Sequence, residues 1–205
     1  STVPLPTTLG DVQVLVGGVA APLLYASPGQ INFQVPAATP VGGLVEFQVA
    51  RASTGQVLAS WLFRVDAASP GLFTANGTGA GQLLALNQDG TVNSASNPAK
   101  AGSYVSLFGT GAGALDGMPQ DGAPAQGTIA TPQNPKVFIN SDFVPDADVE
   151  FSGLAPGFVG LWQINVKVPA NVPPADVIVY ITYDGINSIL DPNGIRRSTT
   201  IRTTP

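Results

Sequence analysis

The sequence contains no cysteine and no histidine in its 205 residues. Disulfides and thiol chemistry are therefore excluded, and the commonest general base and transition-metal ligand is also missing. A serine nucleophile would need a lysine as its base, and Lys100, Lys136 and Lys167 do not stand in a Ser-x-x-Lys arrangement. We expect a protein that is not an enzyme and that holds no cofactor.

Charged residues are scarce as well. Asp, Glu, Lys and Arg make up 10% of the chain, against roughly 25% in an average soluble domain, and the net charge is −5. Eight scattered Lys and Arg residues cannot neutralise a phosphate backbone. The longest apolar run, residues 41–49, is interrupted by Gly42, Gly43 and Glu46, whereas a spanning helix needs about 20 apolar residues. The sequence thus predicts neither a nucleic-acid partner nor a membrane span.

Glycine and proline, in contrast, number 24 and 19, and the apolar stretches are rich in valine, isoleucine, threonine and aromatic residues. Frequent turns between β-branched runs predict an all-β fold. The expected strands are short apolar runs bounded by Gly, Pro or Asn, at residues 12–16, 23–25, 31–35, 44–49, 57–65, 83–86, 91–92, 104–108, 137–139, 149–151, 161–168, 177–183 and 198–202.

An internal repeat divides the chain. Residues 30–37, QINFQVPA, return as residues 163–170, QINVKVPA, with six of eight positions identical and an offset of 163 − 30 = 133. Continuing this offset without a gap places Leu44 on Val177 and Phe47 on Tyr180. The repeat predicts two Ig-like β-sandwich domains in tandem, residues 1–69 and 97–205, joined by a hairpin-bearing connector at residues 70–96.

The two copies differ at their starts. The second copy opens with a strand in residues 102–109, GSYVSLFG, and no similar segment precedes the first copy. A first domain without its opening strand exposes an edge that another segment can fill by strand addition. The terminal segments are the predicted donors to a neighbouring copy, through Thr2, Val3, Leu5, Thr7, Thr199, Ile201 and Thr203.

Several long motifs carry a resemblance to a known family. They are residues 5–10, LPTTLG; 21–36, APLLYASPGQINFQVP; 86–94, LNQDGTVNS; and 153–163, GLAPGFVGLWQ. The chain resembles, from about residue 5 to its end, the uncharacterised C-terminal domain family of secreted acidobacterial, Solibacter-type proteins. The resemblance implies an exported Ig-like tandem within a surface protein and implies no activity. This chain departs from the family pattern in the missing opening strand and in a longer, more basic tail at residues 191–197.

A group of acidic residues is a candidate Ca²⁺ site: Asp142, Asp146, Asp148 and Glu150. Their spacing does not match an EF-hand loop. Alternation along a strand would place the last three on its outer face, so a solvated edge is the simpler explanation.

Five aromatic residues are candidates for a sugar-stacking platform: Tyr25, Trp61, Tyr104, Trp162 and Tyr180. Their position within strand runs favours the core for them instead.

These observations together predict a secreted, extracellular or cell-surface structural protein that self-assembles into a filament by strand complementation between subunits. Two alternatives remain open at this point. One is a passive adhesion or spacer module, and the other is a carbohydrate-binding module. The predicted partners are copies of the chain itself or surface glycans.

Overall fold

The computed structural model describes residues 2–189 and 198–205, and the basic tail at residues 191–197 lies outside the described residues. The fold is all-β, as the sequence predicts: within the described part the regular elements are strands, apart from one 3-10 turn at Asp146–Asp148. No helix in that part is long and apolar enough to cross a bilayer.

The chain forms two compact units. Unit 1 contains the residues up to Ala67 together with Asp116–Gly127 and Pro156–Gly160. Unit 2 contains Ala68–Leu115, Thr128–Ala155 and Leu161–Pro205. Residues 70–96, expected as a connector, therefore lie in unit 2.

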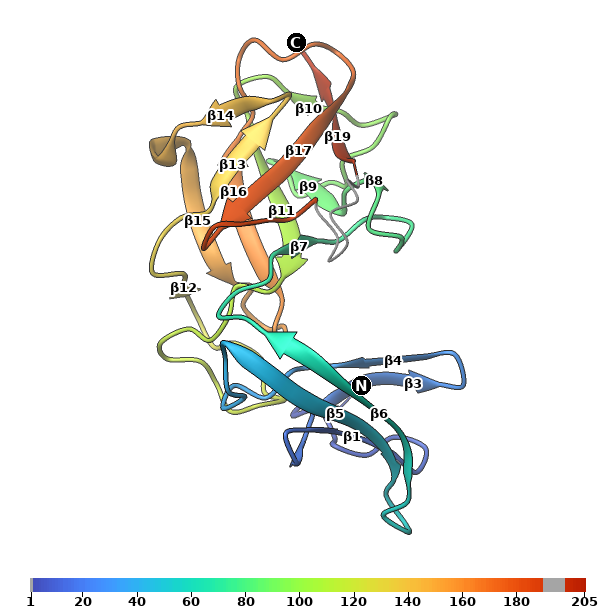
Figure 1. Cartoon of the computed structure of the whole chain (residues 1–205). Coiled ribbons are helices and arrows are strands. Elements are labelled where there is room, and N and C mark those ends of the chain that lie inside the picture. Colours follow the sequence, from blue (N-terminus) through green and yellow to red (C-terminus); the bar gives the residue numbers. More distant parts are fainter. Residues whose placement is uncertain (1, 190–197) are drawn as a thin grey trace. The chain divides into compact units, whose positions relative to one another are not determined.

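Unit 1 has two sheets (Figure 1). The larger one has the strand order β2-β1-β5-β6, with β1 at Val12–Val16, β2 at Val19–Ala20, β5 at Gly43–Arg51 and β6 at Val57–Val65. The smaller one is a hairpin of β3 (Leu23–Ser27) and β4 (Gln30–Phe33). The core cluster takes Val14, Val16 and Val45 from the larger sheet, Leu23 from the hairpin, and Ala21 between them, so the two sheets pack face to face as a sandwich.

Unit 2 is built from two larger sheets. One has the order β10-β19-β17-β13-β14, with β18 and β8 as further partners of β17 and β19, and the other has the order β12-β15-β16-β11-β7, with β9 on β11. Their bounds are β7 Gly71–Leu72, β8 Gly81–Gln82, β9 Ala85–Asn87, β10 Ala99–Lys100, β11 Tyr104–Thr110, β12 Ile129–Ala130, β13 Lys136–Ile139, β14 Asp142–Val144, β15 Val149–Leu154, β16 Trp162–Lys167, β17 Asp176–Tyr183, β18 Ile186–Asn187 and β19 Thr199–Thr204.

The sequence repeat reappears in the strand pairing. In unit 1, Ser27 pairs with Gln30 and Ala26 with Ile31, and the register then shifts at a β-bulge between Leu23 and Tyr25. In the β15–β16 hairpin of unit 2, Gly153 pairs with Gln163 and Ser152 with Ile164. The register then shifts between Phe151 and Val149, at the corresponding place. The repeated residues thus build the same bulged hairpin twice, whereas an Ig-like topology for each unit stays a prediction.

The gapless continuation of the repeat beyond this hairpin is wrong. Leu44 is 69% exposed, whereas Val177, which the sequence offset places on it, is 2% exposed. The buried residue next to Leu44 is Val45, so the structural offset is 177 − 45 = 132, one residue less than in the hairpin. Because side chains alternate across a strand, a one-residue shift moves every side chain to the other face.

A buried polar group ties β19 into unit 2. The Asn93 side chain is 1% exposed, and its Nδ2 donates to Asn87 Oδ1 at 2.9 Å and to the Arg202 carbonyl at 2.8 Å. Its Oδ1 accepts from Gln82 Nε2 at 2.9 Å and from the Arg202 backbone N–H at 2.8 Å. The amide therefore completes four hydrogen bonds that no solvent molecule can replace in a closed core.

We predict that Asn93→Leu lowers the free energy of unfolding of unit 2 by about 2 to 4 kcal/mol, because its partners stay buried and lose their hydrogen bonds. Urea denaturation measures the loss. Val92→Ala is the matched control, since Val92 is 57% exposed and adjacent in sequence. Equal effects of the two substitutions would contradict a structural role for the amide.

Candidate functional site: an open groove in unit 1

The outer edge of β4 is the first difference between the two units. In unit 2, β16 lies between β15 and β11, and β11 pairs with it along six residues from Tyr104 to Gly109. In unit 1, β4 pairs with β3 alone among the described residues. Unit 2 thus has β11, from the predicted opening strand at residues 102–109, on the edge that carries no strand among the described residues of unit 1.

The outer edge of β6 is the second difference. In unit 2, the corresponding strand β19 pairs antiparallel with β17 on one side. On its other side it pairs parallel with β8 and β10. Within the described part of unit 1, β6 pairs with β5 and has no strand on its other side. Among the described residues, β4 and β6 thus each have one edge whose backbone groups pair with no neighbouring strand.

Side-chain burial shows the consequence. Val45 pairs with Phe63 and Val177 with Ile201, so Phe63 and Ile201 hold equivalent positions. Phe63 is 53% exposed and Ile201 is fully buried. Trp61, two residues earlier, is 50% exposed, whereas Thr199 at the matching position is 2% exposed. The inward face of β6 is therefore about half uncovered at Trp61 and Phe63, whereas Val65 packs against the core.

The β4 side of the gap shows the same contrast. Ile31 and Phe33 are only partly buried, whereas their counterparts Ile164 and Val166 are 0% exposed. Between β4 and β6 lies a hollow of about 350 Å³, which we call the open groove. Its lining residues are Val14, Ser27, Pro28, Gly29, Gln30, Ile31, Phe33, Phe47, Gln48, Val49, Trp61 and Phe63.

The lining of the open groove contains no ionisable side chain. Phe47 is one of the lining residues, and its ring centroid is 5.4 Å from that of Phe63 in an edge-on contact and 6.3 Å from that of Phe33. The nearest carboxylate along β5, Glu46, belongs to the opposite face, and a hydrogen bond from Ser60 at 2.6 Å lowers its pKa. Such a groove has no acid, base or anchoring charge to offer and suits a neutral, largely apolar ligand.

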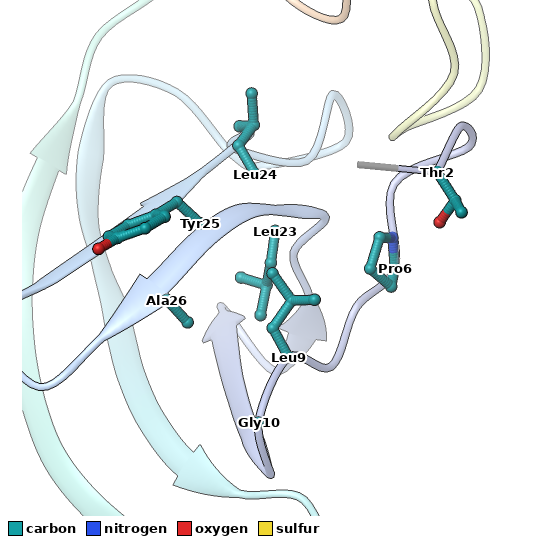
Figure 2. A pocket seen from close by; sticks show the side chains of 8 residues that line it. All are labelled: Thr2, Pro6, Leu9, Gly10, Leu23, Leu24, Tyr25 and Ala26. Atoms are coloured by element: carbon teal, nitrogen blue, oxygen red, sulfur yellow. The ribbon is translucent and has the colours of Figure 1, made fainter.

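A second hollow of about 390 Å³ lies in the same unit, and Figure 2 shows it. Its lining residues are Thr2, Pro6, Leu9, Gly10, Leu23, Leu24, Tyr25 and Ala26. The side chains of Leu9 and Leu23 lie together at its centre, and the Tyr25 ring points away from them. The backbone N–H of Leu23 donates to the Pro6 carbonyl at 2.8 Å, so the N-terminal segment already lines this edge of β3.

The five aromatic candidates do not form one platform. Trp162 is core: it is 1% exposed, and its Nε1 donates to Ser152 Oγ at 2.9 Å. Tyr180 stacks on Phe138 with centroids 4.6 Å apart, so one face of its ring is covered by a neighbouring side chain. Tyr104 is partly buried in β11. Trp61 and Tyr25 are each 50% exposed, but they line different hollows of unit 1.

The four acidic candidates are not gathered into a metal site. Among the described residues, no group of three or more acidic side chains lies close enough to hold an ion. Asp146 and Asp148 belong to the 3-10 turn rather than to a strand, so the predicted alternation toward one face is wrong there. Asp148 pairs with Lys167 at 3.7 Å, while Asp142 and Glu150 lie on β14 and β15.

The predicted strand donors have unequal positions. Thr199, Ile201 and Thr203 are buried in β19, and two of these side chains also bind backbone: the Thr199 hydroxyl donates to the Val179 carbonyl, and Thr203 Oγ1 donates to the Pro173 carbonyl at 2.6 Å. Serving another copy would require this strand to leave its own sheet first.

At the other end, Thr2, Val3 and Thr7 are exposed. Leu5 is 8% exposed, and its N–H donates to the Gly122 carbonyl at 2.7 Å. Subunit exchange through either terminus stays a prediction.

Comparison with known proteins adds little. No protein-family model matches the chain. No curated protein matches it. Among solved structures, the chain is similar to SGBP-B from the mixed-linkage glucan utilization locus of Bacteroides ovatus, solved in complex with a mixed-linkage heptasaccharide, at 12% identity and a TM-score of 0.30. The match covers 94% of this chain and 36% of that one, so this chain spans little more than a third of it. A TM-score of 0.30 is too low to assign a fold or a ligand.

Because Ile201 is buried and Phe63 is half exposed, replacing each with alanine should destabilise its unit to a different extent. Ile201→Ala in the closed unit should lower the free energy of unfolding by about 2 to 5 kcal/mol, because it leaves a cavity. Phe63→Ala in the open groove should cost only about 1 kcal/mol, although a larger side chain is removed, since half of its surface already meets water. Native-state hydrogen exchange measures each unit separately. A loss for Phe63→Ala as large as that for Ile201→Ala would mean that the groove is covered in solution.

Proposed function

We propose that this chain is a non-enzymatic binding module of an extracellular or cell-surface protein, and that unit 1 binds an extended β-strand of a partner in the open groove. The single observation behind this proposal is the edge of β4, which pairs with no strand among residues 2–189 and 198–205 and lies beside half-exposed Trp61 and Phe63, where the matching edge in unit 2 carries a strand.

The composition of the two edges supports the proposal. Natural sheets protect free edges with charged side chains, proline or bulges, because an unprotected edge recruits other strands. The β4 sequence QINF and the β6 sequence VLASWLFRV contain no proline and a single charged residue, Arg64. The bulge of the hairpin belongs to β3, not to β4. These edges have the features of an acceptor for strand addition.

A glycan is the second candidate ligand, and Trp61 favours it. A half-exposed indole lines the groove, and the face of such a ring can stack on a sugar. The strand is the better fit, because the groove continues an unpaired strand edge and because unit 2 fills the matching place with polypeptide.

The test is selection of a random-sequence peptide display library against the full chain, with counter-selection against Phe63→Ser combined with Trp61→Ser. We expect enrichment of peptides with alternating apolar residues whose binding the double substitution abolishes. Because the lining is uncharged, the affinity should change little between low and physiological salt.

Any one of three results would contradict the proposal. Peptides that bind the variant and the parent chain equally would place the site elsewhere. A library without enriched peptides, together with saturable binding of a defined glucan that the Trp61→Ser substitution removes, would assign the groove to glycans. Concentration-dependent filaments in sedimentation and electron microscopy that the double substitution abolishes would assign it to a second copy of the chain.

A further inference from the structure

One hydrogen bond is common to the two repeated hairpins. In unit 1, Gln30 Nε2 donates to Asn32 Oδ1 at 2.7 Å. In unit 2, Gln163 Nε2 donates to Asn165 Oδ1 at 2.9 Å. The Gln-Ile-Asn motif therefore fixes the asparagine carbonyl in the same way on β4 and on β16.

In unit 2 the same oxygen also binds the neighbouring strand. Ser106 Oγ of β11 donates to Asn165 Oδ1 at 2.9 Å, and Ser106 is directly opposite Asn165 in the register. An amide oxygen has two lone pairs, so it accepts both hydrogen bonds at once. The Asn165 side chain thus accepts a hydrogen bond from a hydroxyl on the strand beside it.

The residues on either side of Ser106 complete this pattern. Val105 and Leu107 are 1% and 0% exposed, and they pair with Val166 and Ile164. The matching positions in unit 1 are Phe33 and Ile31, whose side chains line the open groove. Asn32 lies between them and is exposed, with Gln30 already bound to its oxygen.

We infer that the partner strand runs antiparallel to β4, places a serine or threonine opposite Asn32, and inserts apolar side chains opposite Phe33 and Ile31. This inference rests on the proposed function and assigns the partner's sequence pattern, apolar–hydroxyl–apolar. The uncharged lining agrees with it, since the two apolar side chains would enter the groove while the hydroxyl would meet the Asn32 amide on the other face of β4.

The probe is a synthetic peptide with the sequence of residues 102–110, GSYVSLFGT, added to the full chain and measured by calorimetry and by amide NMR shifts. The shifts should gather on β4 and β6 and leave unit 2 unchanged. Asn32→Ala tests whether the Asn32 amide oxygen accepts a hydrogen bond from the peptide. Gln56→Ala is the control, because Gln56 is an exposed polar residue of the same unit that does not line the groove.

A double-mutant cycle separates the hydrogen bond of the hydroxyl from nonspecific apolar binding. Asn32→Ala in the chain, or alanine in place of the peptide's central serine, should each weaken binding about fivefold, as expected for one hydrogen bond of about 1 kcal/mol. The two changes together should weaken it no more than one alone. Multiplying effects, or no effect of Asn32→Ala, would overturn the assignment of Asn32.

Direction is measured independently with a spin label. A label on the peptide's N-terminus should broaden amides near Gln34, and a label on its C-terminus should broaden amides near Gly29, because Tyr104 lies opposite Lys167 and Gly109 opposite Trp162. The reverse assignment would exclude the antiparallel strand.

These results distinguish the inference from the proposed function. If display peptides bind the groove but lack the apolar–hydroxyl–apolar pattern and this peptide does not bind, the pattern is wrong and the strand acceptor stands. If neither this peptide nor any display peptide binds the groove, both are wrong.

Discussion

The bulged hairpin is the constraint on which unit 1 depends, because it fixes which side chains of β3 and β4 face the larger sheet. Its register is the same as that of β15 and β16 in unit 2. Once the hairpin is set, Leu23, Ile31 and Phe33 face the core side, and the outer edge of β4 is left beside the inward residues of β6. The open groove lies where unit 2 has the third strand β11 and where the described residues of unit 1 place no strand on the edge of β4.

Exposure of apolar surface normally costs stability and invites aggregation. Unit 1 buries a small cluster around Val14, Val16 and Leu23 and leaves Trp61 and Phe63 half uncovered. Unit 2 contains the same strand arrangement with Ile201 and Thr199 sealed by further strands. The chain thus holds a closed and an open version of one hairpin, and the closed version shows what chemistry fits the open one.

Much of this fold could be predicted from the sequence, and the reasons are specific. β1 and β6 have the predicted bounds, because apolar runs between glycines or turns define them. The turn at Asp146–Asp148 and the long segment Asp116–Gly127 were not foreseen, since neither has a periodic pattern. The face reversal between Leu44 and Val177 was missed because one residue of slip leaves the composition of a strand unchanged.

The site could be predicted only in part. Residues 102–109 have no counterpart in the given first copy, which predicted an open edge, whereas the exposure of Trp61 and Phe63 depends on what covers them and not on their own segment. Site-resolved amide exchange of the free chain tests most directly whether the edge of β4 is unpaired. Alternate amides of Gln30–Phe33 should exchange at nearly unprotected rates while all amides of Trp162–Lys167 stay protected. Full protection along β4 in the free chain would contradict an unpaired edge.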